Sequence, residues 1–109
     1  MKLLSLTYRI NPEKDGGFSV HCLDWKSVFT QGETIAECRK NAIEATELML
    51  EVLNDGKLDN TALPKIKSHS ANPFHFQLTF DVEKSKHINL SKIQKKTKLN
   101  SLQNFMAIF

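Results

Sequence analysis

The chain has 109 residues, of which 40% are hydrophobic and 25% charged, and its formal net charge is +3. This is the size and composition of one globular domain with a real core, and it excludes a wholly disordered protein. No apolar run is long enough to span a membrane. The alternating start MKLLSLTYRI, with no small-residue cleavage site after it, is a poor signal peptide. We therefore expect a cytoplasmic protein that has no contact with membranes.

The charge is unevenly distributed along the chain. Residues 1–83 carry 9 Lys and Arg against 12 Asp and Glu, whereas residues 84–109 carry six lysines and no acid. An acidic body with a basic tail favours a basic partner for the body and a polyanionic partner for the tail. The alternative is that the lysines only keep a terminal segment soluble. We therefore divide the chain into a body, residues 1–83, and a C-terminal tail, residues 84–109.

Three short strands are expected in the first third of the body. Apolar and polar residues alternate along residues 2–10, which is typical of a half-buried strand. A turn rich in Pro and Gly follows and leads into a second strand at residues 18–23. Residues 24–27 connect it to a third strand at residues 28–31. Because the connections are short, the three strands should form an antiparallel meander.

The element with the clearest signals is a helix that begins after Thr34. Thr34 and Glu37 form a capping box, in which a side chain and a backbone N–H at each position satisfy one another. Apolar or small residues then recur at steps of three and four on one face. Asn54, Asp55 and Gly56 tolerate the left-handed conformation with which helices commonly end. The sequence therefore predicts a long amphipathic helix between Thr34 and Gly56.

A fourth strand is expected at residues 74–82, after a polar stretch that contains two prolines. Its apolar face is unusually heavy, so it should lie beneath the helix. That face consists of Phe74, Phe76, Leu78, Phe80 and Val82. The long connection permits a parallel partner, most simply the first strand. The expected body is an α+β unit of β-β-β-α-β order, with a four-stranded sheet and one long helix on one face.

The tail has the pattern of a short helix, a turn and the start of a second helix. Its lysines can neutralise phosphates, and its polar residues stand where a helix-turn-helix meets base edges. The candidate DNA-binding residues are Lys92, Lys95, Lys96, Lys98, Asn100, Ser101, Gln103 and Asn104. One such fragment is too small to bind well, so useful affinity requires a homodimer or higher oligomer that presents several tails. The alternative is a cationic arm without sequence preference.

The central part of the chain resembles the HicB family of antitoxins. The similarity covers roughly residues 1–83 and keeps the spacing of the family pattern. It is carried by Asp15-Gly16-Gly17-Phe18, Asp24, Thr30-Gln31-Gly32-Glu33-Thr34, Glu37 and Asn41-Ala42-Ile43-Glu44-Ala45. The departures lie in the turn, where Leu23, Trp25, Lys26, Ser27 and Val28 replace the usual Pro, Leu, Pro, Gly and Cys.

The resemblance implies a partial ribonuclease H-like fold that neutralises a small mRNA-cleaving toxin called HicA. Family members typically add a C-terminal module that binds their own operator, and the tail here is shorter than such modules. The expected partners are therefore a HicA-like toxin and operator DNA. Asp24, Trp25 and Glu33 are the candidate toxin-binding residues. Trp25 has two expected placements of equal weight, in the core or exposed as a contact anchor.

No catalytic residue, metal site or cofactor is expected. Cleavage by two metal ions needs several converging carboxylates, and the polar face of the first strand offers Ser5, Thr7 and Arg9 instead. The histidines and cysteines match no common zinc spacing. His21 and Cys22 should face opposite sides of a strand, as a surface histidine and a core thiol. The alternatives to an antitoxin are a DNA-binding regulator without a toxin and, less favoured, a ribonuclease H-like enzyme.

Overall fold

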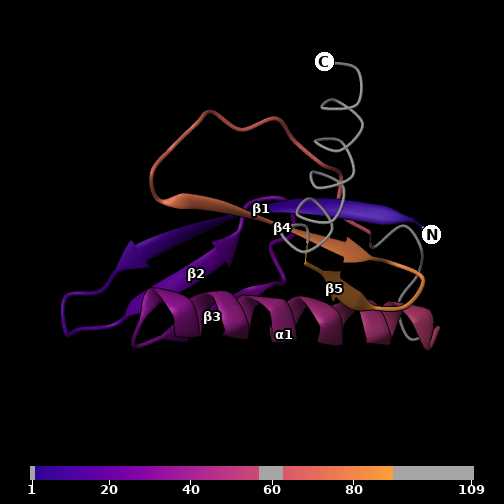
Figure 1. Cartoon of the computed structure of the whole chain (residues 1–109), viewed down its shortest axis with the longest axis horizontal. Helices are drawn as coiled ribbons and strands as arrows, with labels where there is room; N and C mark the ends of the chain where they lie inside the picture. Colours follow the sequence, from indigo (N-terminus) through magenta and orange to yellow (C-terminus); the bar gives the residue numbers. More distant parts are fainter. Residues whose placement is uncertain (1, 57–62, 90–109) are drawn as a thin grey trace, which may run out of the picture.

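The structure is a computed structural model and describes residues 2–56 and 63–89. One long helix lies against a curled sheet of five strands (Figure 1). In chain order the elements are β1 (Leu3–Pro12), β2 (Phe18–Cys22), β3 (Phe29–Gly32), α1 (Ile35–Asn54), β4 (His75–Asp81) and β5 (Lys86–Ile88). The expected α+β class, the meander and the helix are confirmed. No helix in the described ranges is both long and apolar enough to cross a membrane.

The sheet differs from the expected one in two respects. Its order is β3-β2-β1-β4-β5, so it has five strands rather than four. β5 pairs with β4 and lies beyond residue 83, where the tail was expected to begin. All neighbouring strands are antiparallel, including β1 and β4, which run from Leu3 opposite Asp81 to Arg9 opposite His75. The predicted parallel pairing of these two strands is therefore wrong.

The connection after α1 explains the antiparallel pairing. The helix ends beside the far end of β4, where the side-chain amide of Asn54 donates to the carbonyl oxygen of Val82 at 2.9 Å. Residues 63–73 then carry the chain back over the sheet, on the side away from α1 (Figure 1). β4 therefore begins opposite the end of β1 and returns in the opposite direction. A helix connection permits parallel strands but does not require them.

The core lies between α1 and the concave face of the sheet. The fully buried side chains include Leu6, Tyr8, Val20, Cys38, Thr46, Leu50, Leu78 and Phe80. The start of β4 is less buried than its sequence predicts, since Phe76 is half-buried and Phe74 is 47% exposed. The helix packs mainly on β3, and a cavity of about 230 Å³ remains at this corner, lined by Ile35 of α1 together with Phe74 and Phe76.

The positions predicted for the ends of α1 are observed, and of the predicted capping box the structure shows the bond that Thr34 accepts. The side chain of Thr34 accepts a hydrogen bond from the backbone N–H of Glu37 at 3.0 Å. At the other end, Gly56 has φ +73 and its N–H donates to the carbonyl oxygen of Leu53. These caps satisfy backbone groups that the helix itself leaves without partners.

Both edges of the sheet are bonded to side chains of α1. Asn41 donates to the carbonyl oxygen of Gln31 in β3 at 2.7 Å. Glu47 accepts from the backbone N–H of His87 in β5 at 2.9 Å. Because the sheet curls around the helix, the edge strands come within reach of these polar side chains. Such contacts reduce the tendency of edge strands to pair with other chains.

Candidate acidic binding site

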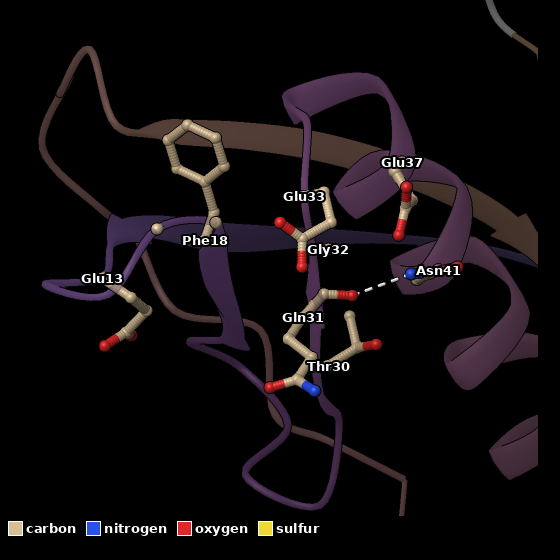
Figure 2. A pocket seen from close by; sticks show the side chains of 10 residues that line it. Glu13, Phe18, Thr30, Gln31, Gly32, Glu33, Glu37 and Asn41 are labelled. Carbon is tan, nitrogen blue, oxygen red and sulfur yellow. Dashed lines mark hydrogen bonds between the residues drawn. The ribbon is translucent and has the colours of Figure 1, made fainter.

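A polar cavity of about 440 Å³ lies where the β1–β2 turn, β3 and the start of α1 meet (Figure 2). Its lining residues are Glu13, Gly16, Gly17, Phe18, Thr30, Gln31, Gly32, Glu33, Glu37 and Asn41. The carboxylates of Glu13, Glu33 and Glu37 come from three separate segments of the chain, and the lining contains no Lys or Arg. The charged groups of the lining are therefore all negative.

Two glycines allow these segments to come so close. A Cβ atom on Gly32 would lie 2.9 Å from the backbone nitrogen of Cys38, so only glycine lets β3 pass directly against the first turn of α1. Gly17 has φ +75, and a Cβ there would lie 3.1 Å from the carbonyl oxygen of Gly32. The left-handed conformation of Gly17 closes the turn that begins at Glu13. Close backbone packing thus brings the acidic side chains together.

The three carboxylates have no cationic partner among residues 2–56 and 63–89. The pKa of the nearby Cys38 thiol is raised, mainly by burial and in addition by the negative charges of Glu37 and Glu33. The first turn of α1 offsets part of the negative charge through its helix dipole. The described part of the chain holds no cluster of three His, Cys, Asp or Glu suited to a metal ion. The cavity is thus suited to a cationic group of a partner, such as a Lys or Arg side chain.

Asp24, a candidate toxin-binding residue, is an interior residue of the structure. Its carboxylate accepts hydrogen bonds from the N–H of Thr7 at 2.8 Å, the N–H of Lys67 at 3.0 Å and His69 Nε2 at 2.8 Å. Burial alone would disfavour its charge, but these bonds together hold the pKa of Asp24 below its ordinary value. Asp24 therefore links the connection at residues 63–73 to the middle of β1.

Trp25 lies in the core, with 6% of its surface exposed. The first of its two expected placements is therefore the observed one, and Trp25 is not a surface anchor. A tight turn directs it inward, because the N–H of Val28 donates to the carbonyl oxygen of Trp25 at 3.0 Å. Of the three candidate residues, only Glu33 lines the cavity.

Sequence reasoning did not select Glu13, Glu37 or Asn41 as binding residues. Glu37 and Asn41 were nevertheless visible as members of the family pattern. Glu13 had no such signal, because only the fold of the β1–β2 turn brings it to the cavity. His21 is exposed and Cys22 buried, as the alternation predicts. All eight candidate DNA-binding residues, from Lys92 to Asn104, lie outside the described residues, and their role stays a prediction.

Comparisons with known protein families, with curated proteins and with solved structures find no match for this chain.

Proposed function

We propose that this chain is an antitoxin of the HicB type, which binds and neutralises a small mRNA-cleaving toxin similar to HicA. One observation carries the proposal. The segments that resemble the family are spread over residues 15–45, and all the residues that line the acidic cavity except Glu13 belong to them. The resemblance therefore centres on one place in the fold, and that place has the charge that a basic partner needs.

Charge complementarity gives the mechanism. A toxin that cleaves RNA must present cationic groups to its substrate. Glu13, Glu33 and Glu37 can bind those groups and cover them, so that the toxin no longer reaches RNA. Complementary charges also speed the encounter and select the partner. The proposed action is steric, and it requires no bond-breaking step by the antitoxin itself.

The proposal has three further parts for which the described residues give no direct support. They are the ribonuclease H-like relationship of the sheet, assembly into a homodimer or larger oligomer, and repression of the operon through the tail. The first rests on the resemblance and on the meander followed by a long helix. The other two rest on the resemblance and on the lysines of residues 84–109.

The experiment uses the protein encoded by the reading frame next to this one, which the proposal requires to be small and basic. The full-length chain is titrated with that protein, and cleavage of an mRNA by the complex is measured in parallel. We expect tight binding that suppresses cleavage. The double variant Glu33→Gln/Glu37→Gln keeps the shape of the cavity and removes two charges. It should bind at least about tenfold more weakly, mainly through slower association, with a smaller dependence on salt.

The matched control is Glu44→Gln/Glu51→Gln. It removes the same charge from α1 outside the cavity and should bind almost as well as the native chain. If the native chain neither binds the neighbouring protein nor protects the mRNA, the antitoxin proposal is wrong. Equal weakening in both double variants would mean that overall charge, rather than the cavity, attracts the toxin.

A further inference from the structure

The convex face of the sheet, opposite α1, carries a stripe of rings and cationic groups across four strands. Phe29 in β3 lies opposite His21 in β2, His21 opposite Arg9 in β1, and Arg9 opposite His75 in β4. The rings of Phe29 and His21 meet edge to face, with 4.6 Å between their centroids. His69, from the connection before β4, adds a further ring at 6.4 Å from that of His75.

The stripe presents its groups to solvent. Phe29 is 54% exposed, as is Leu3 at the other end of this face, His21 is exposed, and Arg9 is half-buried. Asn11 accepts a hydrogen bond from Arg9 Nε at 3.0 Å and so orients the guanidinium. Within residues 2–56 and 63–89, no hydrogen bond or ion pair engages the terminal nitrogens of Arg9. The guanidinium of Arg9 also lies over the ring of Phe74, 6.0 Å from its centroid, which leaves its terminal nitrogens able to donate to a ligand.

A further cavity, of about 350 Å³ and with a mixed polar and apolar lining, adjoins the stripe. It is lined by Thr7, His69, Ser70, Ala71, Asn72, His75, Phe76 and Gln77. The Nδ1 atom of His75 is shielded from solvent and has no hydrogen-bond partner among the described residues. The groups that a ligand in this cavity could reach are its exposed polar side chains, Ser70 and Gln77.

The convex face and the helix side differ in charge. Among the described strand residues on the convex face, Asp81 is the single acid, and it is 3% exposed with its carboxylate bonded to the turn after β4. The connection at residues 63–73 adds exposed Lys65 and Lys67 and contains no acid. Exposed glutamates lie instead on the side of α1. A polyanion would therefore meet no exposed carboxylate on the described strands of the convex face, and the one carboxylate behind it, that of Asp24, is buried and bonded to His69.

We propose that this convex face binds single-stranded nucleic acid. Unpaired bases would stack on Phe29 and His21, and Arg9 would bind a phosphate beside them. The exposed side chains of Ser70 and Gln77 would hydrogen-bond a base edge or sugar in the adjoining cavity. Aromatic side chains next to unpaired cations are what proteins use to bind single strands, since every base has a face that can stack. A duplex hides those faces, so it should bind less well.

This inference does not depend on the antitoxin proposal, because it uses neither the acidic cavity nor the tail. The test uses the full-length chain and fluorescently labelled oligouridine and oligothymidine of about 12 nucleotides, with a duplex of the same length. Anisotropy at near-physiological salt gives the dissociation constants. We expect the single strands to bind at least tenfold more tightly than the duplex. A preference for uridine over thymidine strands would identify RNA as the ligand, and the reverse would identify DNA.

The variants separate the convex face from the tail. Phe29→Ala and Arg9→Gln should each weaken binding of single strands by about tenfold. Leu48→Ala and Lys40→Gln, which change an exposed apolar residue and a cation on α1, serve as matched controls and should bind normally. Circular dichroism and thermal melting establish that each variant is folded. Native affinity in both Phe29→Ala and Arg9→Gln would overturn the proposal. It would also be overturned if only replacement of the tail lysines abolished binding. Absence of binding by the native chain, or equal binding of duplex, would also overturn it.

Discussion

The hydroxyl groups of Tyr8 and Thr46 lie 2.6 Å apart in the interior, where neither side chain is exposed. The hydroxyl of Thr46 also donates to the carbonyl oxygen of Ala42, one turn earlier in α1, at 2.8 Å. Because a hydroxyl has one proton, Tyr8 must be the donor to Thr46. Burial raises the pKa of the Tyr8 phenol well above its ordinary value, so it keeps this proton. The chain of bonds therefore has a fixed direction from sheet to helix.

That direction predicts unequal costs for removing the two hydroxyls. Tyr8→Phe removes one hydrogen bond and leaves Thr46 bonded to Ala42, so it should cost about 0.5–1.5 kcal/mol. Thr46→Val leaves the Tyr8 hydroxyl buried without a partner, so it should cost about 1–3 kcal/mol. Urea unfolding of the two single variants measures the difference. A larger loss in Tyr8→Phe than in Thr46→Val would show that the bonds run in the other direction.

Asp24 should control stability in acid. Its pKa is lower in the folded chain than its ordinary value of 3.8, so its contribution is present above about that pH and is lost as the pH falls through the lower folded value. Asp24→Asn keeps the shape but removes the charge, and one of its two oxygen acceptors becomes a donor. It should cost about 2–4 kcal/mol at pH 7 and flatten the stability curve below pH 4.

The measurement for Asp24 is unfolding free energy at a series of pH values, for the native chain and for Asp24→Asn. The control is Asp15→Asn, which changes an exposed carboxyl in the β1–β2 turn. It should shift neither the neutral value nor the acid part of the curve. If the unfolding free energy of Asp24→Asn fell as steeply below pH 4 as that of the native chain, this role of Asp24 would be contradicted.

Trp25 should report on the core rather than on a partner. It is the only tryptophan, and its burial predicts native emission at short wavelength and weak quenching by acrylamide. Trp25→Ala should cost about 3–5 kcal/mol in unfolding free energy, as is usual for a buried aromatic side chain. Trp25→Phe should cost less, because it fills more of the space. Quenching as strong as that of free tryptophan would place the ring on the surface.

The local patterns determined most of the fold. The alternation of residues 2–10 and 18–23, the cap at Thr34 and the periodicity of α1 depend on neighbours in sequence, and each was predictable. The direction of β4 was not, because it depends on where residues 63–73 lead the chain. The same applies to β5, whose three residues pair with β4 only after a tight turn at Ser85, which has φ 54.

The acidic cavity and the convex stripe show the same distinction between local sequence patterns and features that depend on the tertiary fold. Glu33, Glu37 and Asn41 were recognisable from their order in the chain, but their common cavity follows from the approach of β3 to α1. Trp25 could not be placed from its turn alone, since a short polar connection can direct a ring either way. The convex stripe depends on register across four strands. No single segment contains it, so no local motif could reveal it.

Gly32 tests whether the close approach of β3 and α1 is needed. A Cβ there would lie 2.9 Å from the backbone nitrogen of Cys38 and 3.2 Å from the backbone carbonyl carbon of Glu37, and neither backbone atom can turn aside as a side chain could. Gly32→Ala should therefore push β3 from the helix and cost about 1–3 kcal/mol. Gly16→Ala is the matched control: nothing lies within 4 Å of its Cβ, and only the strain of φ +100 opposes it.

Because Gly32 also shapes the acidic cavity, Gly32→Ala should weaken binding of the basic partner even where the variant remains folded, whereas Gly16→Ala should weaken it less. Thermal unfolding and titration of both variants measure the two effects. Native stability and native affinity in Gly32→Ala would mean that β3 and α1 do not pack this closely.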